Sequence, residues 1–147
     1  NLRHIVTTKA WFGGGADLEE AHRPWIVERN GLRIAFLGYD EFKPRAFEAG
    51  ANKPGIAWSG EDERVIDDII AARTRYHADL VIPFMHWGWE DEGYPSERQK
   101  LFAREMLDAG ADMAGHVLKR GWIERTRLRL HGSRNGNIEG ARGDDIF

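Results

Sequence analysis

The sequence predicts an α/β fold, in which a sheet with flanking helices is preceded by a β-hairpin. Three observations predict it. Asn30-Gly31 separates two apolar runs, residues 61–77 repeat apolar side chains at helical spacing, and further short apolar runs alternate with helical segments. Alternation of this kind is typical of right-handed βαβ units, whose helices cover a sheet with parallel strands.

The hairpin is predicted at the first of these features. Residues 25–29 form its first strand and residues 32–39 its second. Asn-Gly is a strong hairpin signal, because a type I′ turn needs positive φ at both central positions. Residues 34–37 are all apolar, so we expect the second strand to be buried on both faces.

A helix is predicted over about residues 61–77, after a Gly- and Pro-rich loop at residues 40–60. Ser59 is the expected N-cap, since a serine hydroxyl accepts a hydrogen bond from a free backbone N–H of the first turn. The acidic residues 61–63 suit the positive end of the helix dipole. The apolar positions at helical spacing are Val65, Ile66, Ile69, Ile70 and Tyr76.

The next elements are a strand, a second helix and a short third strand. Residues 80–85 are apolar and predict a core strand, although Pro83 lacks an N–H donor and favours an edge or irregular position. Ser96 is expected to begin the second helix and Gly110 to end it. Residues 111–114 are predicted to start the third strand.

Composition limits the class of protein. The chain has 147 residues, of which 41% are hydrophobic and 31% charged, a profile that excludes a chain disordered throughout. It has no cysteine, which excludes disulfides and thiolate metal sites. No run of about 18 apolar residues is present, so no membrane span is expected in this segment. The net charge of −3 gives no reason to expect nucleic acid as a partner.

Charge and apolar content divide the chain near residue 114. Residues 1–113 carry a net charge of −6, whereas residues 114–147 carry +3. Residues 131–145 contain almost no apolar side chain, which is typical of poorly folded chain. We therefore predict an α/β domain over residues 1–113 and a divergent, poorly structured basic tail over residues 114–147.

Residues able to do chemistry follow the predicted core strands. Asp40 follows the first strand, His86 and Glu90 follow the second, and His116 follows the third. Ligands of open α/β sheets bind beyond the carboxyl ends of the strands, so we expect these side chains at one edge. Imidazole and carboxylate bind zinc, manganese or iron, and such a metal would polarise a phosphoryl or acyl oxygen. The alternative is that each histidine is a hydrogen-bonded loop residue. No functional role is predicted for His4, His22, His77 and His131.

Two tryptophans flank a glycine in the same segment. Trp87 and Trp89 could form a stacking wall for a sugar or a peptide-like ligand. Alternatively, one ring packs on the core and the other covers a loop. Gly88 would let the backbone approach a ligand or a metal closely.

Several segments together resemble a bacterial protein family. They are residues 17–31 (DLEEAHRPWIVERNG), 54–57 (PGIA), 78–88 (ADLVIPFMHWG) and 108–112 (DAGAD). These segments are similar to motifs of the CapA capsule-synthesis family, also called poly-γ-glutamate biosynthesis proteins. The similarity extends over about residues 13–113. The core of that family resembles the calcineurin-type metallophosphoesterase fold, so we expect a partial metallophosphoesterase-like sheet.

The resemblance implies a capsule or poly-γ-glutamate synthesis-type protein with a metal-dependent, phosphoesterase-like hydrolase site. His86 and His116 would be metal ligands, and His86 and Glu90 would be the catalytic groups. The implied cofactor is a divalent metal: manganese, zinc or iron. The implied partners are an anionic polymer or phosphoester substrate and the capsule-synthesis machinery. Asp40 would lie at the rim of the pocket, and with Trp87 and Trp89 it completes the candidate substrate-binding residues.

The chain departs from the family pattern at both ends. The early metal-binding motifs of the family lie upstream of the similar region. The strand and GxHPHV motif that usually follow DAGAD are shortened here to residues 113–117 (MAGHV). The resemblance therefore implies an incomplete metal site in a truncated or frame-shifted product. The alternatives are a non-enzymatic module that binds an anionic polymer or a partner protein, and an inert remnant.

Overall fold

The structure is a computed structural model that describes residues 11–41, 45–88, 94–113 and 115–116. A short 3-10 helix, η2, lies at Arg45–Phe47. The strands and α-helices follow in the order β1 (Gly14–Gly15), α1 (Leu18–His22), β2 (Trp25–Arg29), β3 (Leu32–Asp40), β4 (Gly55–Ile56), α2 (Asp62–Thr74), β5 (Leu80–His86), α3 (Glu97–Asp108) and β6 (Gly115–His116).

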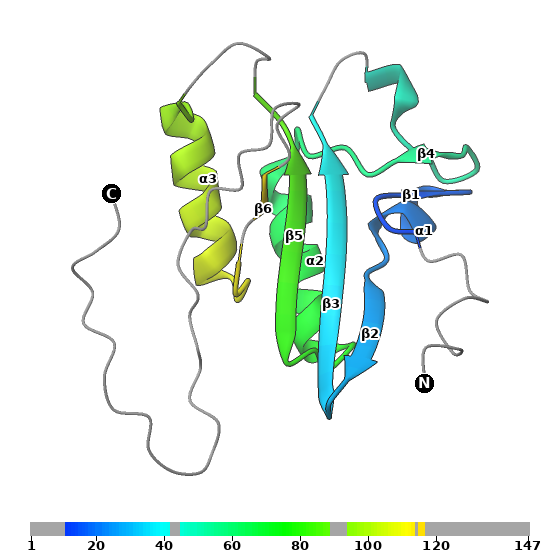
Figure 1. Ribbon diagram of the computed structural model, residues 1–147. Helices are drawn as coiled ribbons and strands as arrows, with labels where there is room; N and C mark the ends of the chain where they lie inside the picture. The colour runs from blue at the N-terminus through cyan, green and yellow to red at the C-terminus, as the bar shows by residue number, and fades with distance from the viewer. Residues whose placement is uncertain (1–10, 42–44, 89–93, 114, 117–147) are drawn as a thin grey trace.

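The main sheet has the strand order β2-β3-β5-β6 over the described ranges. β2 is antiparallel to β3, whereas β3, β5 and β6 are mutually parallel. β1 and β4 form a small separate pair. Figure 1 shows α2 behind the sheet and α3 beside it. The predicted α/β class is confirmed, with a hairpin before the parallel strands, and the arrangement is consistent with a partial metallophosphoesterase-like sheet.

The turn of the hairpin lies where the sequence predicts it. Asn30 and Gly31 have φ of 52° and 79°. Both values lie in the left-handed region that a type I′ turn requires. The register that follows from this turn pairs Trp25 with Phe36, and it decides which side chains of β3 face the helices.

Helices α2 and α3 pack on one face of the sheet. α2 contributes Val65, Ile69 and Ala72, whose spacing places them on one side of a helix. α3 contributes Phe102 and Met106. The buried side chains of β3 and β5 on this face are Ala35, Leu37, Tyr39, Val81, Pro83 and Met85.

The start of α2 differs from the prediction. The N-cap residue is Glu61, whose side chain makes no capping hydrogen bond, so the expected cap at Ser59 is wrong. Ser59 is buried, and its backbone N–H donates to the carbonyl oxygen of Asp40, with an N···O distance of 3.1 Å. This contact holds Ser59 against the end of β3, ahead of the first turn of the helix.

The ends of α3 agree with the prediction. Ser96 and Gln99 form a capping box. Ser96 Oγ accepts the backbone N–H of Gln99 at 3.3 Å, and Gln99 Oε1 accepts the backbone N–H of Ser96 at 2.7 Å. Gly110 has φ of 117°, in the left-handed region that commonly ends a helix.

The expected edge or irregular position of Pro83 is wrong. Pro83 lies within β5, which has β3 on one side and β6 on the other. β6 pairs only with Phe84 and Met85 in the described residues. The described pairing with β6 starts at Phe84, the residue after Pro83.

The third strand begins at Gly115 and not at residue 111. The preceding segment is held by the side chain of Asp112 together with one backbone hydrogen bond, in which the Asp112 N–H donates to the carbonyl oxygen of Val81 at 2.9 Å. The buried carboxylate of Asp112 accepts the backbone N–H of Val81 at 2.8 Å and forms an ion pair with Arg73. Arg73 also donates to the carbonyl oxygen of Gly110. These contacts tie the segment before β6 to both β5 and α2.

The face of the sheet opposite the helices carries aromatic side chains. Neighbouring rings have centroids 5.4–6.1 Å apart. Ile34 and Phe36 on this face are half-buried, so residues 34–37 are fully buried on the helix side only. Asp40 and His86 extend this face, because alternate residues of a strand point the same way. The rings that gather here are Phe12, Trp25, Phe36 and Phe84.

Two further predictions concern the whole chain. No helix in the described ranges is long and apolar enough to cross a membrane. Of the predicted basic tail, residues 114–147, only the backbone of residues 115–116 is described. The boundary near residue 114 and the character of the tail therefore stay predictions.

Candidate functional site

The C-terminal ends of β3 and β5 bring Asp40 and His86 together. The two strands are parallel, and their register places Asp40 opposite His86. His86 Nδ1 lies 3.3 Å from Asp40 Oδ2. Two candidate residues that are 46 positions apart in the sequence thus share one edge of the sheet.

A second carboxylate, that of Glu41, lies at the same edge. Its backbone N–H donates to the carbonyl oxygen of His86 at 2.9 Å. Arg98 of α3 forms ion pairs with both Glu41 and Asp62. Burial raises the pKa of Glu41 above its usual value, an effect that Arg98 opposes and the Asp62 charge reinforces. The sequence analysis missed Glu41 and Arg98, although Glu41 directly follows a candidate at a strand end.

The segment after β5 packs against α3. Trp87 is 6% exposed, and its ring meets the ring of Phe102 edge-on with centroids 5.8 Å apart. This packing favours the core interpretation for Trp87, and its role in substrate binding stays a prediction. Gly88 has φ of 87°, and a Cβ there would lie 2.6 Å from Gln99 Nε2. The close approach that Gly88 permits is therefore to a side chain of α3.

The remaining candidates are described in part or not at all. Trp89 and Glu90 lie outside the described residues. The backbone of His116 pairs with Met85, the residue before His86, so β6 reaches the same edge. Among the residues with described side chains, no group of three or more His, Asp or Glu could hold a metal ion. The metal site predicted from sequence stays a prediction.

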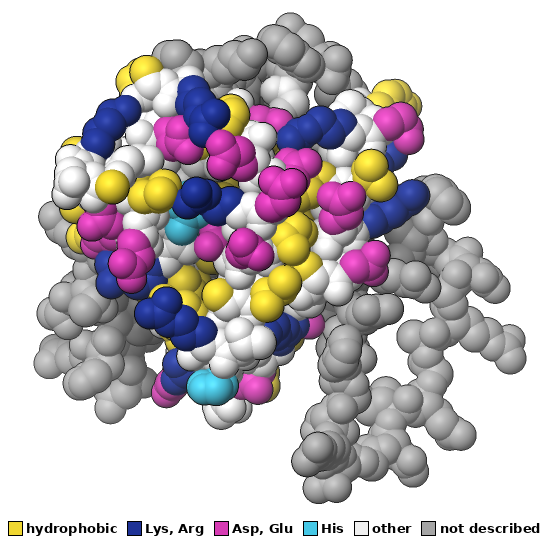
Figure 2. All heavy atoms as spheres, turned by 180° about the vertical axis from the view of Figure 1, so that it is seen from behind, with side chains coloured by type: hydrophobic (Ala, Val, Ile, Leu, Met, Phe, Trp, Pro, Cys, Tyr) yellow, Lys and Arg dark blue, Asp and Glu magenta, His cyan; other side chains and the backbone are white. Residues whose placement is uncertain are grey.

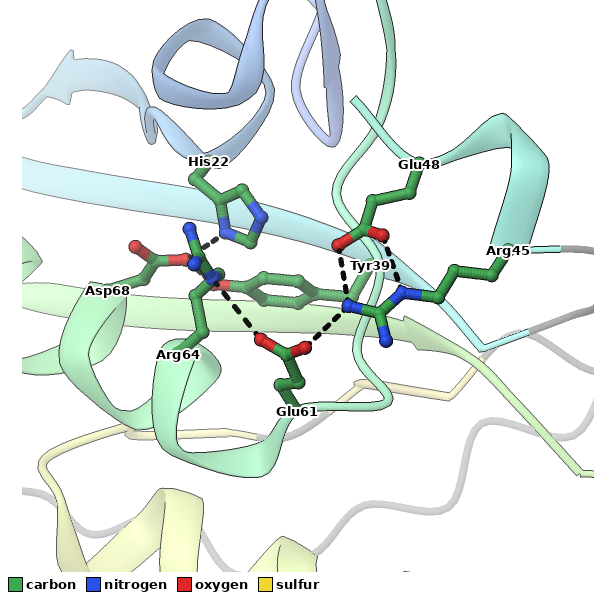
Figure 3. Close-up of polar contacts among 7 residues, drawn as sticks. All are labelled: His22, Tyr39, Arg45, Glu48, Glu61, Arg64 and Asp68. Atoms are coloured by element: carbon green, nitrogen blue, oxygen red, sulfur yellow. Dashed lines mark hydrogen bonds and ion pairs between the residues drawn. The ribbon is translucent and has the colours of Figure 1, made fainter. Parts of the chain in front are cut away.

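A second polar cluster lies on the helix side of the sheet, where Figure 3 shows His22, Tyr39 and Asp68. Asp68 Oδ2 accepts the Tyr39 hydroxyl at 2.9 Å and lies 2.6 Å from His22 Nδ1. Burial, with the Asp68 charge, raises the pKa of Tyr39 well above its usual value. These residues come from β3, α1 and α2 and share no local motif, which is why the sequence analysis gave His22 no role.

A surface ion-pair network adjoins this cluster in Figure 3. Arg45 pairs with Glu48 at 2.7 Å and with Glu61 at 2.5 Å. The hydrogen bond from Arg45 lowers the pKa of Glu48. Because these side chains are largely solvated, each pair contributes little to stability. The network links η2 to the start of α2.

Comparison with known proteins agrees with this architecture. The family model "Bacterial capsule synthesis protein PGA_cap" matches residues 7–119. The PGA biosynthesis protein CapA of Bacillus subtilis (strain 168) is 38% identical over 106 residues, which cover 71% of this chain and 27% of that protein. The capsule biosynthesis protein CapA of Bacillus anthracis is 34% identical over 113 residues, covering 72% of this chain and 26% of that protein.

A relative with lower identity matches a similar share of both chains. A probable polyglutamine synthesis accessory protein of Mycobacterium tuberculosis is 32% identical over 115 residues, covering 71% of this chain and 30% of that protein. The chain thus spans less than a third of the length of these relatives. Since the family model matches most of the chain, the chain belongs to the bacterial capsule synthesis protein family PGA_cap.

Proposed function

We propose that this chain contributes one edge of a metal-dependent, phosphoesterase-like hydrolase site to a protein of capsule or poly-γ-glutamate synthesis. The observation that carries the proposal is the pairing of Asp40 with His86 at the ends of two parallel strands. Family membership supports the biological setting, because the relatives named above are a PGA biosynthesis protein and a capsule biosynthesis protein.

The side chains at this edge contain atoms of the types that bind a divalent metal. Imidazole nitrogen and carboxylate oxygen are ligands for zinc, manganese and iron. A carboxylate beside one ring nitrogen commonly orients an imidazole that binds a metal, and Asp40 lies beside His86 Nδ1 in this way. His86 would hold the metal with His116. Glu90 would be a further ligand or an acid–base group.

The residues around such a metal have separate tasks. A bound divalent metal supplies a Lewis acid that polarises a phosphoryl oxygen. Asp40, beside His86 Nδ1, would orient the His86 imidazole toward the metal. Arg98 places a guanidinium, 45% exposed, at the same edge, where it suits an anionic phosphoester oxygen. Glu41, with its raised pKa, keeps its proton to higher pH than an ordinary glutamate.

Metal binding and hydrolysis by the purified chain test the proposal. Calorimetric titration with Mn²⁺ and Zn²⁺ measures binding, and a chromogenic phosphodiester measures hydrolysis. We expect His86→Ala to abolish both, and Asp40→Asn to weaken metal binding about 10–100-fold, as loss of an orienting carboxylate commonly does.

A histidine away from this edge provides the control. His77 is exposed and has φ of 53°, a conformation that asparagine tolerates. His77→Asn should therefore leave metal binding and hydrolysis unchanged. Equal metal binding by His86→Ala and His77→Asn would contradict the proposed site.

A second candidate function is a non-enzymatic module that binds an anionic polymer or a partner protein. The aromatic face favours it, because Trp25 on this face is 37% exposed. Trp11, which directly precedes Phe12 of the same face, is 59% exposed. This function predicts polymer binding that Trp25→Ala weakens and His86→Ala leaves unchanged, with no hydrolysis at saturating metal.

A further inference from the structure

The first turns of α3 contact the residues that follow β5. His86 is the last residue of β5, and Trp87 and Gly88 come directly after it. The ring of Phe102 packs edge-on against Trp87, with centroids 5.8 Å apart. Gln99, one turn earlier on the helix, lies against Gly88. α3 therefore contacts both residues through which the chain leaves His86.

The side chain of Gln99 is fixed in one orientation. It is 8% exposed, and its Oε1 accepts the backbone N–H of Ser96 at 2.7 Å. Because a backbone N–H needs an acceptor, the amide oxygen faces Ser96 and the amide nitrogen faces the other way. A Cβ at Gly88 would lie 2.6 Å from that nitrogen, Gln99 Nε2. The capping box thus aims the amide nitrogen at the turn after β5.

Gly88 makes this contact possible. Its φ of 87° lies in the left-handed region, which a residue with a Cβ adopts only with strain. The absence of a side chain also leaves the space that the Gln99 amide occupies. The conformation of the turn and the position of α3 therefore depend on each other.

The backbone of His86 is held from the opposite side, by the end of β3. Its carbonyl oxygen accepts the N–H of Glu41 at 2.9 Å. Arg98, the residue before Gln99, forms ion pairs with Glu41 and with Asp62. Figure 2 shows acidic and basic side chains interspersed over the helix side of the molecule, and exposed pairs among such side chains contribute little to stability. The buried contact of Gln99 is therefore the stronger link between α3 and this edge.

We propose that Gln99 is a positioning residue for His86. By fixing the turn at Gly88, its side chain sets the direction in which the chain leaves β5, and so the place of the His86 imidazole at the edge. A metal ligand has to be held within about 0.5 Å of its productive position, and the side chains behind it supply that constraint. The importance for a metal rests on the proposed function, whereas the positioning rests only on the contacts of α3.

Hydrogen exchange of the metal-free chain, followed by NMR, tests the positioning in Gln99→Ala. The Glu41 N–H reports the place of the His86 backbone, because it donates to the His86 carbonyl oxygen. The Asp40 N–H donates to the carbonyl oxygen of Ala57 and is the reference in the same spectra. We expect Gln99→Ala to reduce the protection of Glu41 relative to Asp40. Unchanged relative protection would overturn the proposal.

Ser96→Ala is the matched control. It removes the hydroxyl that accepts the Gln99 N–H, but it keeps the backbone N–H that holds the Gln99 side chain. It should destabilise α3 without changing the protection of Glu41 relative to Asp40. An equal change in Ser96→Ala and Gln99→Ala would show that Gln99 acts only as part of the helix cap, and would overturn the positioning.

A second pair of variants tests the same contact from Gly88. Gly88→Ala forces a Cβ against Gln99 Nε2 and should lower the relative protection of Glu41. Gly110→Ala is its control, because Gly110 also has a positive φ, of 117°, but its Cβ would lie at 3.4 Å from Arg73. An effect of Gly110→Ala on Glu41 as large as that of Gly88→Ala would overturn the proposal.

Metal titration separates this inference from the proposed hydrolase. In a chain that binds Mn²⁺, Gln99→Ala should weaken binding about tenfold, whereas Ser96→Ala should leave the affinity unchanged. Equal weakening in both variants overturns the positioning. A wild-type chain that binds no metal contradicts the proposed function, and the relative protection of Glu41 then still decides whether Gln99 positions His86.

Discussion

Individual residues at the end of β3 show which parts of the site a sequence can predict. Asp40 and His86 were predictable, because each directly follows an apolar run and parallel strands end at a common edge. The partners of Glu41 and His22 were not predictable. Arg98 is 57 residues from Glu41, and Asp68 is 46 residues from His22. Packing of helices on the sheet creates these pairs, and it leaves no periodic pattern.

Replacement of Arg98 by glutamine should raise the pKa of Glu41 further, because Arg98 supplies the interactions that lower it. NMR titration of the Glu41 side-chain carboxyl measures this pKa directly. Arg104→Gln, on the same helix, should leave it unchanged. A Glu41 pKa that stays constant or falls in Arg98→Gln would show that the ion pair does not act on Glu41.

The raised pKa of Glu41 also gives stability a pH dependence. The folded protein keeps the proton above the ordinary value of 4.5, so the favourable contribution is complete below that value. It is lost as the pH rises through the folded-state pKa. Urea unfolding from about pH 4 to about pH 7 should therefore show the wild type losing stability relative to Glu41→Gln. A difference that is constant with pH would refute this linkage.

Loss of the Tyr39 hydroxyl should destabilise the fold. Tyr39 is 4% exposed and donates to the Asp68 carboxylate, so Tyr39→Phe removes a buried hydrogen bond to a charged group. We expect a cost of about 2 kcal/mol in the free energy of unfolding. Tyr94 is 88% exposed, and Tyr94→Phe should change stability by less than about 0.5 kcal/mol. Equal costs in urea denaturation would contradict the role of this hydrogen bond.

At the scale of elements, the hairpin, β5 and the ends of α3 were predictable, whereas the cap of α2 and the start of β6 were not. The Asn30-Gly31 turn and the capping box of α3 depend on adjacent residues, which a sequence displays. Pro83 was misplaced because the residues around it do not show that β5 has a neighbouring strand on both sides. The start of β6 was misplaced because the segment before it is held by the Asp112 and Arg73 side chains and a single backbone hydrogen bond to Val81.

A serine side chain caps α3 but not α2, and one substitution near the start of each helix tests this difference. Ser96→Ala should cost about 1 kcal/mol, because Ser96 Oγ caps α3. Ser59→Ala should cost less, because Ser59 Oγ is buried without a hydrogen-bond partner among the described residues. Chemical denaturation of both variants measures the two costs. A larger loss of stability in Ser59→Ala than in Ser96→Ala would contradict this assignment of the two hydroxyl groups.

At the scale of the whole molecule, the two faces of the main sheet have different side chains and different roles. One face of the sheet buries the core with α2 and α3, and the other face carries aromatic rings that lead to the Asp40–His86 edge. The chain covers about a quarter of the two CapA relatives. Family membership and fold class were predictable because several motifs lie in their expected order. The metal and the substrate stay predictions, because the side chains of Trp89, Glu90 and His116 lie outside the described residues.

Paramagnetic broadening by Mn²⁺, followed through the backbone amide signals, tests the proposed metal edge most directly. The expected result is that the signals of Asp40, Glu41 and His86 broaden first, and that His86→Ala removes this effect. Broadening centred on exposed carboxylates elsewhere, such as Asp67 on α2, would contradict a metal site at the ends of β3 and β5. The same broadening in wild type and His86→Ala would contradict it equally.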